Sequence, residues 1–131
     1  MYKVVKVNEA VATRTIGLEN IETGVSIECF DDSALVSLEN FEFMEVGKVY
    51  DCKIKLFGSF VDYETTTSVS IRVKEEIFVG RKMMMKVILD KELYYIPIDN
   101  GNEVSIGNIL NFEFTRRDLI QVEDVIHRDY L

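Results

Sequence analysis

A two-residue alternation of apolar and polar side chains recurs along most of the chain, with turn residues between the runs. It is clearest at 49–57, 68–74 and 109–116. Side chains two positions apart lie on the same face of an extended strand, so each of these segments has one apolar face and one polar face. The pattern predicts half-buried β-strands and argues against helices at these positions.

Weaker runs predict further strands, separated by glycine, proline and acidic turn residues. Pro97 places its strand at a sheet edge or at the strand's own end, because proline cannot donate to the hydrogen-bond ladder. Gly58 is expected to kink or end the strand that contains it. The expected strands are 2–16, with a bulge near 8–10, then 25–30, and a hairpin of 83–89 and 93–98 with its turn at 90–91.

Other segments have less regular patterns. Residues 31–33 are expected to end one strand and to cap a short helical turn that extends to Leu38, since Asp and Ser side chains accept hydrogen bonds from free backbone N–H groups. Residues 41–46 fit either a short strand or the tail of that turn. Residues 119–126 fit a strand or one face of a helix, and we favour the strand. A polar break is expected at 74–76, and a turn is expected at 99–102.

Eight or nine short strands with little helix predict an all-β, mainly antiparallel protein, folded as one domain over residues 1–131. A small closed or partly open barrel, with at most one or two short helices, is favoured over a two-sheet sandwich because closure removes exposed sheet edges. A long bent strand, a hairpin, a short turn and a glycine-led strand follow in an order that resembles oligonucleotide/oligosaccharide-binding (OB) barrels. The resemblance is one of architecture, and no residue motif carries it.

The chain also contains a hint of internal repetition. Val46-Gly47 and Ile106-Gly107 each precede a strand, and the inward positions of the two strands coincide. Upstream, the strand that ends at Asp31 aligns loosely with the one that ends at Asp99. The spacings between these landmarks differ, and any all-β chain can produce such a match by chance. Duplication is therefore a hypothesis at this point.

The composition is that of a folded protein, with 47% hydrophobic residues, 29% charged residues and one proline. No stretch approaches the roughly 18 consecutive apolar residues of a membrane span. The first twenty residues lack the continuous apolar centre of a secretory signal, because charged residues interrupt them, among them Lys3, Lys6, Glu9 and Arg14. We expect a cytoplasmic protein with no membrane association.

The two cysteines, Cys29 and Cys52, both fall on the inward phase of their strands. Such thiols pack like small apolar groups, so we expect two reduced core residues. A disulfide is the alternative if the strands are neighbours, but it is disfavoured in a chain without an export signal. A catalytic thiol is disfavoured further, since reactive cysteines are partly exposed beside positive charge.

Residues for catalysis or metal binding are otherwise scarce. His127 is the only histidine and is expected to be a surface or terminal residue, so neither a multi-histidine metal site nor a catalytic triad is easily built. Asp31 and Asp32 could supply half of a cation site with Asp51 or Asp62, although turn and cap roles explain the pair. We expect a protein that is not an enzyme, with no catalytic residue, metal or cofactor.

The net charge is -8, and residues 1–64 carry twelve acids against six bases. This field repels a phosphate backbone, whereas it speeds association with a basic protein surface. The charge favours a non-catalytic protein-binding module, such as a small acidic inhibitor, immunity protein or adaptor. The candidate partner-binding residues, expected to gather on one exposed face, are Asp31, Asp32, Glu39, Glu42 and Glu45.

Residues 65–100 are the exception, with six bases and five acids. The alternative function is therefore an OB-like barrel that binds single-stranded nucleic acid or another extended ligand, with bases stacked on exposed aromatic rings. This alternative requires at least two exposed aromatic side chains beside bases on one sheet. Its candidate residues are Lys53, Lys55, Phe57, Phe60, Lys86 and Tyr94.

Overall fold

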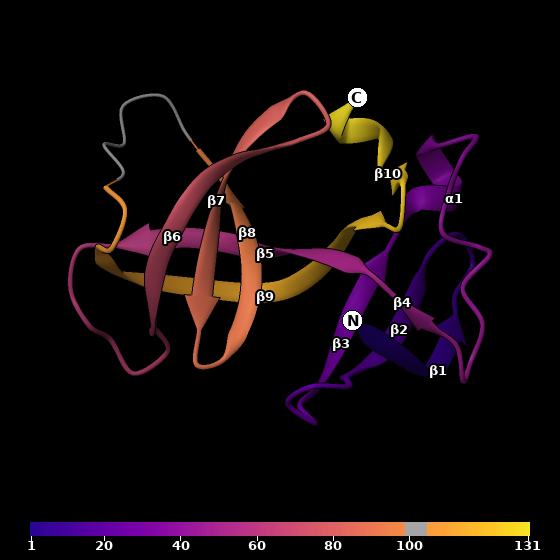
Figure 1. Cartoon of the computed structure of the whole chain (residues 1–131), viewed down its shortest axis with the longest axis horizontal. Coiled ribbons are helices and arrows are strands. Elements are labelled where there is room, and N and C mark those ends of the chain that lie inside the picture. Colours follow the sequence, from indigo (N-terminus) through magenta and orange to yellow (C-terminus); the bar gives the residue numbers. More distant parts are fainter. Residues whose placement is uncertain (99–104) are drawn as a thin grey trace.

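A computed structural model of the chain describes residues 1–98 and 105–131. The predicted turn at 99–102 lies within residues 99–104, which are outside the described residues. The described part is built from strands and contains one helical turn and one 3-10 turn, which confirms the prediction of an all-β barrel (Figure 1). The elements are β1 (Tyr2–Glu9), β2 (Arg14–Asn20), β3 (Ser26–Asp31), α1 (Ser33–Val36), β4 (Val49–Tyr50), β5 (Cys52–Val61), β6 (Val69–Val79), β7 (Lys82–Leu89), β8 (Glu92–Pro97), β9 (Ile109–Val122), β10 (Val125–Ile126) and η1 (Arg128–Tyr130).

Five strands close into a barrel. β6, β7 and β8 form an antiparallel meander, β8 pairs in parallel with β5, β5 pairs antiparallel with β9, and β9 returns to β6. β9 thus lies beside β6, the first strand of the meander, although it follows β8 in the chain. This is a Greek-key arrangement, as in OB barrels. The ring leaves few unpaired strand edges, which is the physical advantage of closure.

The N-terminal strands close another ring with the other ends of the same long strands. We call it the first ring, because its strands come first in the chain, and we call the β5–β9 barrel the second ring. β1, β2 and β3 form a meander, β3 pairs in parallel with β9, and β9 pairs with the start of β5. β4 is separated from β5 by one residue, Asp51. It pairs with β1 and completes the ring. Figure 1 shows β5 and β9 running along the long axis of the molecule, with β1–β4 at one end and β6–β8 at the other.

The two ends of the molecule repeat one backbone arrangement, as the duplication hypothesis requires. The N–H of Gly47 donates to the carbonyl of Val4, and that of Gly107 donates to the carbonyl of Val73, both at 2.8 Å. β1 and β6 are the first strands of the two repeats. β1 has a register shift against β2 directly after Val4, and β6 has one against β7 directly after Val73. The connection from the third strand to the glycine is the longer one in the first repeat, where it contains α1.

Some local predictions were wrong. Residues 2–16 are not one bent strand but the hairpin β1–β2, closed by a hydrogen bond from Ala10 N–H to the Thr13 carbonyl. Residues 74–76 do not interrupt a strand, since β6 absorbs the extra residue as a bulge. Residues 41–46 are neither strand nor helix, and α1 ends at Val36.

Other local predictions were confirmed. Residues 119–126 are extended, as the end of β9 and then β10, joined by a turn. β5 has a register shift at Gly58, β8 ends at Pro97, and the β7–β8 hairpin turns at Asp90 and Lys91. No helix in the described ranges is long and apolar enough to cross a membrane.

One continuous apolar core fills both rings. It includes Ile16 and Leu18 from the first ring, Ile71 and Val87 from the second, and Ile54 from the shared strand β5. Burial of this kind is the main source of stability in a domain of this size.

Both cysteines belong to this core and are free thiols, as predicted. Burial raises the pKa of the Cys29 thiol, and burial together with nearby Asp51 raises the pKa of Cys52 to about 12. Both groups therefore stay protonated and unreactive near neutral pH.

A smaller apolar cluster covers the outer face of β7 and β8. Met84 and Tyr95 on this face pack with Val79, Ile120 and Tyr130. Tyr130 comes from η1, so the C-terminal segment closes over the second ring. This sheet is therefore buried on both sides where the segment lies on it.

Candidate functional site

The connection between β3 and β4 has an unusual number of exposed apolar side chains. We call residues 32–48 the acidic connection. Leu35 is 57% exposed and Leu38 is fully exposed, while Phe43 and Val46 are also on the surface. Scattered single apolar residues are normal on a protein surface, but several on one irregular segment mark a candidate contact site.

Four of the predicted acidic residues lie on the same segment, and three of these four are exposed. Glu39, Glu42 and Glu45 are exposed and lie among the exposed apolar residues of the connection. The other two acids do not belong to an exposed face. Asp31 is buried and Asp32 is half-buried, so the prediction that all five carboxylates face solvent is wrong for this pair.

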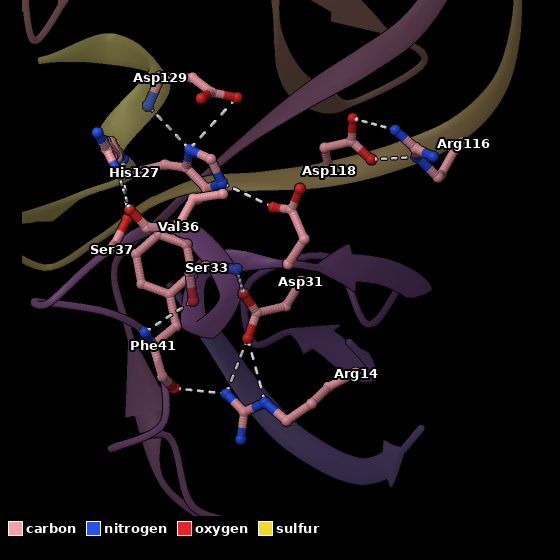
Figure 2. A network of polar contacts seen from close by, with 12 residues as sticks. Arg14, Asp31, Ser33, Val36, Ser37, Phe41, Arg116, Asp118, His127 and Asp129 are labelled. Atoms are coloured by element: carbon pink, nitrogen blue, oxygen red, sulfur yellow. Dashed lines mark hydrogen bonds and ion pairs between the residues drawn. The ribbon is translucent and has the colours of Figure 1, made fainter. Parts of the chain in front are cut away.

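Asp31 is buried because it holds an ion pair with Arg14 across β2 and β3. Arg14 Nη2 donates to Asp31 Oδ2 at 2.9 Å, and the same nitrogen donates to the Phe41 carbonyl at 2.6 Å (Figure 2). The other carboxylate oxygen accepts from the Ser33 N–H at 2.9 Å. A buried carboxylate needs such partners to offset the loss of water. Since Asp31 is committed to these contacts, it does not serve as half of a cation site.

The acidic connection is fixed to the barrel at several points. The side chain of Phe41 is buried, and its N–H donates to Ser33 Oγ at 3.0 Å. Further along, the Glu45 N–H donates to the Tyr50 hydroxyl at 3.0 Å, and the Phe43 and Tyr50 rings meet edge to face. The exposed side chains are therefore carried on an ordered frame, which lowers the entropy cost of binding.

His127 anchors the connection from the other side. It is buried, so the prediction of a surface position is wrong. It is 4% exposed, and its Nε2 lies 2.6 Å from Asp32 Oδ1 (Figure 2). Its Nδ1 accepts from the Asp129 N–H at 3.1 Å, which places the ring proton on Nε2. Both nitrogens are used, so the imidazole has no free position for proton transfer to a substrate. Its role is to tie the C-terminal segment to α1.

The acidic connection borders a cleft of about 340 Å³. One wall is the β1–β2 turn with Glu9 and the fully exposed Val11, and the other carries Leu35 and Glu42. Arg14 and Asp31 also line it. The cleft therefore combines apolar side chains with a negative rim, and it extends the acidic surface beyond the connection itself.

Comparison with known proteins adds no relative. No protein-family model, curated protein or solved structure matches the chain. The function proposed below therefore rests on the chemistry of the surface.

The residues of the alternative ligand face are split between two places. Lys53 and Lys86 line one cleft, whereas Lys55, Phe57 and Phe60 line another. Tyr94 lies in neither, because its ring is buried in the core and its hydroxyl accepts from Arg117 Nε at 3.1 Å. The prediction of Tyr94 as an exposed stacking ring is wrong.

Phe57 is the exposed ring of this set, but cations already lie over it. The Lys55 ammonium is 5.3 Å from the ring centroid and the Arg116 guanidinium is 4.5 Å from it. Arg116 also stacks on Phe30 at 4.4 Å and pairs with Asp118, whose hydrogen bond raises the arginine pKa. The ring is thus part of an intramolecular cation–π cluster.

The lysine cleft, of about 380 Å³, lies where the two ends of the molecule meet. Lys53 lies over the Tyr95 ring, with its ammonium 5.8 Å from the centroid, and Lys86 pairs with Glu75 at 3.7 Å. Tyr95 is itself 7% exposed. Its ring is covered and offers no stacking surface.

Proposed function

We propose that the chain is a non-catalytic protein-binding module that contacts its partner through the acidic connection. The observation that carries the proposal is the row of exposed apolar residues, Leu35, Leu38, Phe43 and Val46, interleaved with Glu39, Glu42 and Glu45. The partner we expect is a protein with an apolar patch bordered by lysine or arginine.

The physical basis is the usual division of labour at protein interfaces. Apolar side chains at the centre of a contact supply most of the affinity when they are desolvated. Charges at the rim steer the encounter and select the partner, and they contribute less to affinity. The acidic connection holds both kinds of group on a segment fixed by the Arg14–Asp31 pair and by His127.

Nucleic-acid binding is not the function we propose. Stacking needs open ring faces, and Tyr94 and Tyr95 are covered while cations lie over Phe57. Lys53 and Lys86 form a cleft without an exposed ring, separate from the phenylalanines.

Differential affinity capture tests the proposal. The tagged chain is compared with its Leu38→Asp variant in nuclease-treated extract of cells that produce it, and bound proteins are quantified by mass spectrometry. Tyr63→Asp is the matched control, because Tyr63 is also highly exposed between two acids, Asp62 and Glu64, but lies outside the connection.

The expected result is a protein that is retained by the wild type and by Tyr63→Asp and is lost with Leu38→Asp. The purified protein should then bind the chain directly with the same dependence on position 38. Capture that does not distinguish the two variants, or the absence of any retained protein, would contradict the proposal.

A further inference from the structure

The β6–β7 hairpin ends in a basic and apolar tip. Phe78 and Met83 are directly paired across the two strands, and Phe78 is 60% exposed. Arg81 and Lys82 lie beside them, exposed, and neither forms an ion pair within the described part of the chain. We call these four residues the basic tip.

The C-terminal turn holds the basic tip in place. The Arg81 N–H donates to the Tyr130 carbonyl at 2.6 Å, and the Lys82 ammonium lies 5.3 Å from the centre of the Tyr130 ring. Tyr130 itself is buried, and Figure 1 shows η1 beside the end of the β6–β7 hairpin. The tip is therefore a fixed projection, and its side chains need little ordering on binding.

The hairpin at the equivalent place in the first repeat has the opposite character. It is β1–β2, and its end carries Glu9, the last residue of β1, and the fully exposed Val11 of the turn. That turn forms one wall of the acidic cleft beside Leu35 and Glu42. One chain thus carries a convex basic–apolar tip and a concave acidic–apolar cleft.

We infer that the basic tip of one copy binds the acidic cleft of a second copy. Phe78 would enter between Val11 and Leu35, while Arg81 and Lys82 would reach the carboxylates of Glu9 and Glu42. This inference rests on the proposed function, since it uses the same acidic surface and names the partner as another copy of the chain. The contact joins two different patches, so it forms either a reciprocal pair or a growing chain of copies.

The net charge of -8 on each copy opposes association at long range. At physiological ionic strength the screening length is about 8 Å, so repulsion between distant parts of two copies is largely removed. Opposite charges that meet at the contact are closer than this and keep their attraction. Local complementarity therefore decides the outcome under these conditions.

Sedimentation velocity with charge-reversed variants tests the inference. The tip variant is Arg81→Glu/Lys82→Glu, the cleft variant is Glu9→Lys/Glu42→Lys, and the control is Asp62→Lys/Glu64→Lys on the loop after β5. We expect the wild type and the control to associate with rising concentration and each of the other variants to remain monomeric. A mixture of tip and cleft variants should restore a complex, because each surface then meets a complementary one.

A wild type that stays monomeric up to its solubility limit would overturn the inference, and so would association that the tip and cleft variants do not change. These results do not decide the proposed function, which has its own test through Leu38. A monomeric chain that still captures another protein through Leu38 would refute the second-copy contact alone.

Discussion

Gly47 and Gly107 have the same backbone conformation and the same hydrogen bond at equivalent places in the two repeats. Their φ angles are +90° and +89°, and each N–H donates to a valine carbonyl on the first strand of its own repeat. Gly47 lies just before β4, which is followed by β5, and Gly107 lies just before β9; β5 and β9 are the strands that cross both rings. The pair therefore fixes where each shared strand begins.

Alanine at either glycine should destabilise the fold by about 1 to 2 kcal/mol, because residues with a Cβ disfavour positive φ. Since the two sites are equivalent, the losses for Gly47→Ala and Gly107→Ala should be similar. Urea unfolding measures them, with Lys48→Ala as an exposed neighbouring control. A loss at one glycine only would argue against the equivalence.

Arg14→Met should cost about 3 kcal/mol, because it leaves the Asp31 carboxylate buried without its cation. Lys86→Met removes a more exposed pair with Glu75 and should cost less than about 1 kcal/mol. Urea unfolding of both variants gives the comparison. Equal losses would mean that the Arg14–Asp31 pair has no special structural weight.

His127→Ala should release the C-terminal segment from α1, since the contacts to Asp32 and to the Asp129 N–H are both lost. We expect a loss of about 2 kcal/mol and faster amide exchange in residues 125–131 than elsewhere in the chain. Hydrogen exchange read by mass spectrometry locates the change. Asp124→Ala, an exposed substitution in the same segment, is the control and should leave that exchange unaltered.

The free energy of unfolding should fall as the pH rises above the ordinary pKa of a cysteine thiol. Burial raises the folded-state pKa of Cys52 from 9.0 to about 12, so the folded state keeps a proton that the unfolded chain gives up. The stabilisation is complete below the unfolded pKa and is lost between these two values, by roughly 2 to 3 kcal/mol at about pH 11. The pKa values of Cys29, Tyr2 and Tyr130 are raised in the same direction by burial.

The urea midpoint, followed from about pH 8 to about pH 11, measures this dependence. In Cys52→Ala the same titration should be shallower. A wild-type midpoint that stays constant over the range would contradict the buried placement of these groups.

The strands could be predicted from the sequence because burial on one face leaves a period of two, as at 49–57 and 109–116. The sequence did not reveal that β5 and β9 serve two rings, since strand partners depend on contacts far apart in the chain. It also missed the β1–β2 turn at 10–13, which contains neither glycine nor proline.

The candidate site was predicted in part. Glu39, Glu42 and Glu45 were found from charge alone, whereas Asp31 was misplaced because its partner, Arg14, lies seventeen residues away on another strand. The exposed leucines were missed because alternation describes strands and the connection has none. The sequence feature that could have indicated these exposed side chains is a group of apolar residues, Leu35, Leu38 and Phe43, in a segment without a regular period.

The most direct test of the protein-binding account is site-specific photo-crosslinking from position 38 in cells that produce the chain. A photoreactive residue in place of Leu38 should yield a discrete adduct with a protein, either another protein or a second copy of the chain. The same residue in place of Tyr63 should yield none. No protein adduct from position 38, or the same adducts from both positions, would contradict the assignment of the acidic connection as the binding surface.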